Sequence, residues 1–135
     1  MMIKEPVIMM IDDDDDDRKM FFDAAKEVSE TIQCITAEDG EQALKLLSSP
    51  LSELPDYIFL DLNMPRLNGK QCLAAMKKIE RLENIPVIIF TTTRREEDVE
   101  ETKRLGAVHF LTKPVLFEEI CDAIRFVLAE DWKKN

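Results

Sequence analysis

Short apolar runs alternate with amphipathic segments along this chain, and that alternation limits the folds it can adopt. Five runs are rich in branched or aromatic residues, as buried strands are, at residues 7–11, 32–36, 57–60, 87–90 and 107–111. The segments between them carry apolar residues at helical spacing, most clearly in the last one, with Phe117, Ile120, Cys121, Ile124, Val127 and Leu128. Because crossovers between parallel strands are right-handed, five such units predict an α/β fold. We expect a five-stranded parallel sheet, doubly wound in the order 2-1-3-4-5 and flavodoxin-like.

Turn-forming residues fall between these segments and support the same reading. They include Asp39-Gly40, Pro55, Asn68-Gly69, Pro86 and Gly106. The fourth helical segment, residues 95–105, has only Val99 and Leu105 as large apolar residues. We therefore expect this helix to pack more loosely than its neighbours and to be easier to displace.

Length, charge and cysteine content narrow the class of protein. The 135 residues predict a single domain over 1–135, with a core at about 5–130. A net charge of −10 argues against binding to nucleic acid or to an anionic membrane. The first apolar run is too short for a signal peptide, and no segment is long enough to span a membrane. A cytoplasmic location with reduced thiols is expected, since three widely spaced cysteines form no motif: Cys34, Cys72 and Cys121.

Polar residues follow four of the predicted strands at their carboxyl ends. Asp12 and Asp13 come after the first strand, Asp61 after the third, Thr91 after the fourth and Lys113 after the fifth. In a doubly wound sheet these ends share one edge, so three carboxylates, a hydroxyl and an ammonium should converge there. Neighbouring carboxylates repel by about 4 kcal/mol per pair at an effective dielectric near 20, so a cation is expected. Oxygen ligands suit Mg²⁺, and a neutralised carboxylate could attack an incoming phosphoryl group.

Four motifs in this order and spacing resemble the receiver domain of two-component response regulators, of the stand-alone, single-domain type. They are "MMIDD", "FLDLNMPRLNG", "IIFTT" and "FLTKP", and the resemblance covers residues 5 to 130. It implies that Asp61 is the phosphoacceptor and that Thr91 and Lys113 contact the phosphoryl group. The resemblance also implies a cis Lys113-Pro114 bond and an aromatic switch residue at Phe110.

The same resemblance implies a Mg²⁺ site. Direct contacts would come from Asp13, Asp61 and the backbone carbonyl of Asn63, with Asp12 acting through water. Around this site, Met64 and Pro65 would shape the loop after the phosphoacceptor, and Gly69 would permit its tight turn.

The aspartate run at 12–17 exceeds what such a metal site needs. Asp14 to Asp17 fall at the predicted N-cap and first turn of the first helix, where the helix dipole stabilises each carboxylate by roughly 0.3–1 kcal/mol. We interpret these four residues as a helix start. An EF-hand is excluded by spacing. If Asp12 is the first ligand of the calcium-binding loop, the sixth position is Asp17, where an EF-hand requires glycine.

As a receiver, the chain would be a phosphorylatable switch, at most catalysing its own phosphotransfer and dephosphorylation. Its partners would be a sensor histidine kinase or phosphotransfer protein and a downstream effector protein, with no nucleic acid and no membrane. Phe126, opposite the core stripe of the last helix, and Trp132 beyond its end suggest a homodimer or partner surface. His109 is expected to face outward without a catalytic or metal-binding role.

Two other functions stay open on the sequence alone. A phosphatase of the haloacid-dehalogenase type would use Asp12 as nucleophile with Asp14 as its Asp-x-Asp partner, although Asp16 stands where Thr or Val is expected. A non-phosphorylated adaptor would keep the fold for protein contacts only. The intact acidic set argues against an adaptor.

Overall fold

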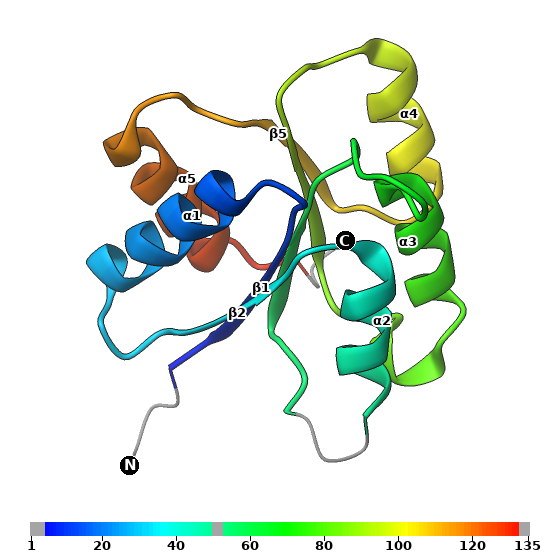
Figure 1. Ribbon diagram of the computed structural model, residues 1–135, viewed down its shortest axis with the longest axis horizontal. Coiled ribbons are helices and arrows are strands. Elements are labelled where there is room, and N and C mark those ends of the chain that lie inside the picture. Colours follow the sequence, from blue (N-terminus) through cyan, green and yellow to red (C-terminus); the bar gives the residue numbers. More distant parts are fainter. Residues whose placement is uncertain (1–4, 50–52, 133–135) are drawn as a thin grey trace.

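Five parallel strands form one sheet with helices on both faces (Figure 1). The computed structural model describes residues 5–49 and 53–132. The strand order is β2-β1-β3-β4-β5, as predicted. The strands are β1 (Val7–Ile11), β2 (Gln33–Ala37), β3 (Tyr57–Leu60), β4 (Val87–Thr91) and β5 (His109–Thr112). The helices are α1 (Asp15–Val28), α2 (Gly40–Ser48), α3 (Gly69–Lys77), the short 3₁₀ helix η1 (Glu80–Leu82), α4 (Glu96–Arg104) and α5 (Phe117–Ala129).

The central strands match the predicted ranges best, and the two edge strands match least well. β2 begins and ends one residue later than predicted, and β5 begins two residues later, at His109. Both edge strands are only partly buried, whereas β1 and β4 are buried throughout, so the expectation of five buried strands was wrong. An edge strand has a neighbour on one side only, and its apolar pattern is correspondingly less complete.

Helices α1 and α5 cover one face of the sheet, and α2, α3 and α4 cover the other (Figure 1). Alternate residues of β1 point to opposite faces: Ile8 and Met10 pack with α1 and α5, and Met9 and Ile11 pack on the other side. The α1–α5 side contains three aromatic rings whose centroids lie 4.8 to 5.8 Å apart: Phe21, Phe59 and Phe90. These two apolar layers hold the sheet rigid beneath its carboxyl edge.

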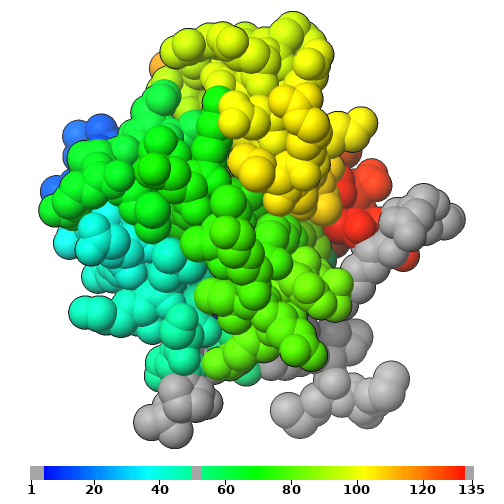
Figure 2. Space-filling model, turned by 90° about the vertical axis from the view of Figure 1, so that its right-hand side faces the viewer, coloured from blue at the N-terminus to red at the C-terminus, as the bar shows by residue number. Residues whose placement is uncertain are grey.

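Helix α4 has the weakest apolar attachment, as the sequence predicted. Its single fully buried side chain within the described residues is Thr102, whose hydroxyl donates to the Asp98 carbonyl at 2.7 Å. Figure 2 shows α4 next to α3 on the outer surface of that face, with α2 on the other side of α3. Lys70 of α3 reaches across to α4, with its Nζ 2.7 Å from Asp98 Oδ1 and 2.7 Å from Glu101 Oε1.

Within the parts of the chain that the structure describes, no helix combines the length and apolar character needed to cross a membrane.

Candidate functional site

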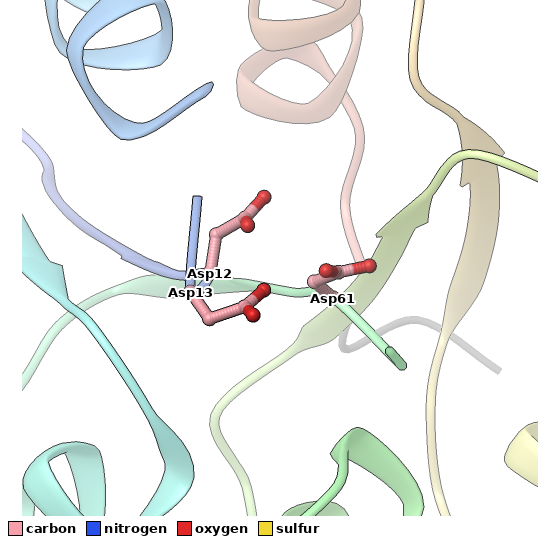
Figure 3. Close-up of side chains that lie close together, drawn as sticks. All are labelled: Asp12, Asp13 and Asp61. Atoms are coloured by element: carbon pink, nitrogen blue, oxygen red, sulfur yellow. The ribbon is translucent and has the colours of Figure 1, made fainter. Parts of the chain in front are cut away.

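Strand register places the first and third strands' acidic residues side by side. Ile11 of β1 pairs with Leu60 of β3, so Asp12 and Asp61 follow adjacent strands at the same level. The Asp61 N–H donates to the Ile11 carbonyl at 3.0 Å, which continues the ladder to the sheet edge. One carboxylate oxygen from each of Asp12, Asp13 and Asp61 lies within 4.8 Å of the others. Figure 3 shows these three side chains gathered at that edge, so the predicted convergence is confirmed.

Two of the three carboxylates are removed from solvent. Asp12 is 0% exposed and Asp61 is 5% exposed, whereas Asp13 lies at the surface. Burial raises the pKa of Asp12 to about 6, and the nearby charge of Asp61 acts in the same direction. Burial also raises the pKa of Asp61, although Lys113, the Thr91 hydroxyl and two backbone N–H groups counteract it. The other residues of the site therefore do not fully compensate the negative charge of these buried carboxylates.

Thr91 and Lys113 reach the acidic set from the next two strands. The Thr91 hydroxyl donates to Asp61 Oδ1 at 2.8 Å. The Lys113 ammonium lies 2.6 Å from Asp12 Oδ2 and 3.7 Å from Asp61 Oδ2. The backbone N–H of Lys113 donates to the Thr91 carbonyl at 2.7 Å, which holds this residue against β4. Burial lowers the pKa of Lys113, but the neighbouring carboxylates outweigh burial and leave this pKa above its ordinary value.

One implied backbone feature is wrong. The Lys113-Pro114 peptide bond is trans. The trans form is the more stable isomer of an X-Pro bond, and with it the lysine still reaches Asp12.

The acidic set fits a divalent cation. Asp12 Oδ2 is buried and accepts no hydrogen bond among the described residues, although it forms an ion pair with the Lys113 ammonium 2.6 Å away. Three oxygen ligands from Asp12, Asp13 and Asp61 at close range are the donor set that Mg²⁺ prefers, with room for water on the exposed Asp13 side. The implied contribution of the Asn63 carbonyl stays a prediction, whereas the Asn63 N–H acts to lower the pKa of Asp61.

The loop after Asp61 can pass close to the start of α3 because residue 69 is a glycine. A Cβ on Gly69 would lie 2.2 Å from the Asp61 carbonyl oxygen, so this glycine is required for space. The left-handed backbone conformation falls instead on Arg66, with φ of 63°, and its guanidinium is held by Asp39 at 2.8 Å. Asn68 caps α3, and the buried Met64 packs into the core below the loop.

The aromatic residue at the predicted switch position lies inward. Phe110 is 7% exposed, and the Arg94 guanidinium lies over its ring at 5.6 Å from the centroid. His109, the neighbouring residue, packs its imidazole against the rings of Phe126 and Trp132.

Sequence reasoning missed one member of the site. Asp17, interpreted only as part of a helix start, has its carboxylate 2.8 Å from Lys113 Nζ. The signal was present: Asp17 precedes the core residues Phe21 and Ala24 by four and seven positions, on the inward face of α1. The interpretation as helix start is otherwise confirmed, because Asp14 is the N-cap and the next three aspartates form the first turn.

The sequence profile of the response regulator receiver domain matches residues 8–125 of the chain. The chain belongs to this family. Protein PilH of Pseudomonas aeruginosa is 40% identical over 97 residues, which cover 72% of this chain and 78% of PilH. Sporulation initiation phosphotransferase F of Bacillus subtilis is 38% identical over 96 residues, covering 71% of this chain and 73% of that protein. The crystal structure of the Mn²⁺-bound response regulator Rcp1 superposes with a TM-score of 0.80 at 27% identity, covering 96% of each chain.

Family membership decides between the functions that the sequence left open. This receiver is a phosphoacceptor of two-component signalling and a phosphorylatable switch rather than a conventional enzyme. Receivers exchange phosphoryl groups with histidine kinases or phosphotransfer proteins and act on downstream effectors. The comparisons give no support to a phosphatase using Asp12 or to a non-phosphorylated adaptor.

Proposed function

We propose that Asp61 is the residue of this receiver that accepts the phosphoryl group, and that Mg²⁺ is its cofactor. One observation carries the assignment: Asp61 is the carboxylate that contacts both the Thr91 hydroxyl and, more distantly, the Lys113 ammonium, beside two further acids. Asp12, Asp13, Asp61 and the Asn63 carbonyl would hold the ion.

In the proposed reaction, an Asp61 oxygen forms a bond to the phosphorus of a phosphohistidine. The bond from phosphorus to the donor imidazole breaks, and the electron pair of that bond stays with the imidazole nitrogen. Lys113 would pair with the phosphoryl oxygens, and the Thr91 hydroxyl would turn from the carboxylate to donate to one of them. Bound Mg²⁺ would neutralise negative charge shared between the acids and the phosphoryl group. Phe110 already lies inward and carries no hydroxyl, so any movement of its ring with Thr91 would be driven by packing alone.

The partners and location belong to the same proposal. The donor is a sensor histidine kinase or a phosphotransfer protein, and the recipient of the signal is an effector protein. One relative's name, sporulation initiation phosphotransferase, is in line with phosphoryl relay. The three cysteine thiols are free, as expected for the proposed cytoplasmic location.

Homodimer formation remains a separate prediction. His109, Phe126 and Trp132 form an aromatic cluster with ring centroids 5.3 to 6.1 Å apart, and Phe126 is 45% exposed. Sedimentation equilibrium of the wild type and of Phe126→Ser, with and without beryllofluoride, tests it. A wild-type monomer at all concentrations would contradict the prediction.

The phosphoacceptor assignment is tested by intact mass after incubation with acetyl phosphate and Mg²⁺. We expect the wild type to gain one phosphoryl group and Asp61→Asn to gain none. Asp122→Asn, an exposed carboxylate on α5, is the matched control and should behave as wild type. Equal phosphorylation of Asp61→Asn and wild type would refute the assignment.

The cofactor is tested without any phosphodonor. Titration with MgCl₂ should shift the backbone amide signals of residues 12, 13 and 61 in an NMR spectrum. Asp13→Asn should weaken the binding by removing one proposed ligand, whereas Asp122→Asn should leave it unchanged. No saturable shift in the wild type would exclude a Mg²⁺ site at these residues.

A further inference from the structure

Lys113 is shared among more carboxylates than phosphoryl transfer requires. Its ammonium lies 2.6 Å from Asp12, 2.8 Å from Asp17 and 3.7 Å from Asp61. The phosphoacceptor is thus the most distant of the three. Asp17 lies outside the group of acids that could hold a metal ion, which consists of Asp12, Asp13 and Asp61.

The position of Asp17 is fixed by α1 and not by the metal-binding acids. Its backbone N–H donates to the Asp14 side chain at 2.9 Å in the N-cap, and four residues later Phe21 anchors the helix in the core. Asp17 and Lys113 also line one cavity of about 400 Å³ between α1 and the start of α5. The carboxylate of Asp17 therefore draws the ammonium toward the helical side of the site.

A phosphoryl group on Asp61 would offer the Lys113 ammonium new oxygen partners on the Asp61 side, where the ammonium now lies 3.7 Å from Asp61 Oδ2. The 2.8 Å bond to Asp17 competes with pairing to those oxygens and opposes any shift of the ammonium toward them. A charge-assisted bond that exists only before phosphorylation stabilises the unphosphorylated state relative to the phosphorylated one.

We propose that Asp17 is a positioning residue that retains the Lys113 ammonium on the α1 side and so sets how readily the phosphorylated state forms. The inference rests on the proposed role of Asp61 and adds the residue that controls its lysine. The neighbouring Asp16 supplies a matched comparison, because it is exposed in the same helical turn and removes the same charge when replaced by asparagine.

The first measurement needs no phosphoryl chemistry. In the wild type, NMR of nitrogen-labelled lysine should show the Lys113 ammonium protected from rapid hydrogen exchange. Asp17→Asn should lose much of this protection, Asp16→Asn should keep it, and Asp17→Glu should partly restore it. Equal exchange in the two asparagine variants would overturn the proposal.

The second measurement is affinity for beryllofluoride, a mimic of the aspartyl phosphate, at saturating Mg²⁺, followed by fluorine NMR. We expect Asp17→Asn to bind about two- to fivefold more tightly than Asp16→Asn, since an ion pair with one partly exposed partner has a modest effect. In a Lys113→Ala background the difference between the two variants should disappear, because Asp17 acts through the lysine. A difference that persists without Lys113 would show a direct charge effect and contradict the proposal.

The two failures are distinguishable. If the wild type neither binds beryllofluoride nor gains phosphoryl mass, the proposed function fails, whatever the lysine signal shows. If the wild type does both and Asp17→Asn matches Asp16→Asn throughout, the function stands and the role of Asp17 is wrong.

Discussion

Gly69 illustrates how one residue governs the geometry of the phosphoacceptor. A side chain there would lie 2.2 Å from the carbonyl oxygen of Asp61 and 2.6 Å from the Cα of Leu62. Both obstacles are backbone atoms, so neither can swing away. The start of α3 can therefore approach the end of β3 closely only if residue 69 lacks a Cβ.

We predict that Gly69→Ala lowers the free energy of unfolding by roughly 1–3 kcal/mol and reduces phosphoryl uptake, because the backbone of Asp61 must shift. Urea unfolding and intact mass measure the two effects. Gly40→Ala is the comparison, since its nearest obstacle, at 2.9 Å, is the end of the Leu67 side chain. A larger loss of stability in Gly40→Ala than in Gly69→Ala would contradict this account.

At the scale of elements, α4 is attached more by charge than by apolar packing. Its contacts to α3 include the two ion pairs of Lys70 with Asp98 and Glu101. Hydrogen bonds from the Lys70 ammonium to both carboxylates raise the pKa of Lys70, so the lysine stays charged over the physiological range. An attachment of this kind is weaker than a buried apolar contact and depends on salt.

We predict that Lys70→Met speeds hydrogen exchange of the α4 amides, residues 96–104, by up to about fivefold, as loss of a partly exposed ion pair worth at most ~1 kcal/mol allows. Methionine keeps much of the aliphatic stem and removes the charge. The control variant Lys103→Met replaces an exposed lysine of α4 itself and should have little effect on this exchange. In 1 M salt, where the screening length is about 3 Å, the exchange rates of the wild-type α4 amides should approach those of Lys70→Met. Unchanged exchange in Lys70→Met would show that α4 is held by other contacts.

For the whole molecule, the buried acids couple stability to pH. The carboxyl of Asp12 has a pKa of about 6 in the folded chain and 3.8 as its ordinary value. Between these values the folded state binds more protons than the unfolded state, so this residue lowers the free energy of unfolding as pH rises through that range. The raised pKa of Asp61 acts in the same direction.

We predict that the difference in unfolding free energy between metal-free wild type and Asp12→Asn changes by roughly 1–3 kcal/mol from pH 4 to pH 7, shifting in favour of the variant. Denaturant unfolding at several pH values in the presence of a chelator measures it. Added Mg²⁺ should raise wild-type stability at pH 7 and leave the variant less affected. A difference that is independent of pH would contradict the assigned pKa.

The sequence predicted the arrangement of the site because a parallel sheet brings all carboxyl strand ends to one edge. Asp12, Asp61, Thr91 and Lys113 each follow a run of apolar residues, so locating the strands located the side chains. The starts of α1, α2 and α3 could also be predicted, because their capping by Asp14, Asp39 and Asn68 is a local interaction. Edge-strand limits were less accurate, since exposure weakens the apolar pattern there.

Side-chain partners across the site were beyond what the sequence could specify. Asp17 and Lys113 are separated by 96 positions, and only the packing of α1 on the sheet brings them within 2.8 Å. The left-handed backbone of Arg66, whose guanidinium is held by Asp39, likewise depends on a residue distant in the sequence. The order of apolar and polar residues thus determined the fold and the acids of its site, because those follow from local periodicity. How the single ammonium is divided among its carboxylates was decided only by tertiary structure, because it depends on ångström-scale distances between elements that no local pattern encodes.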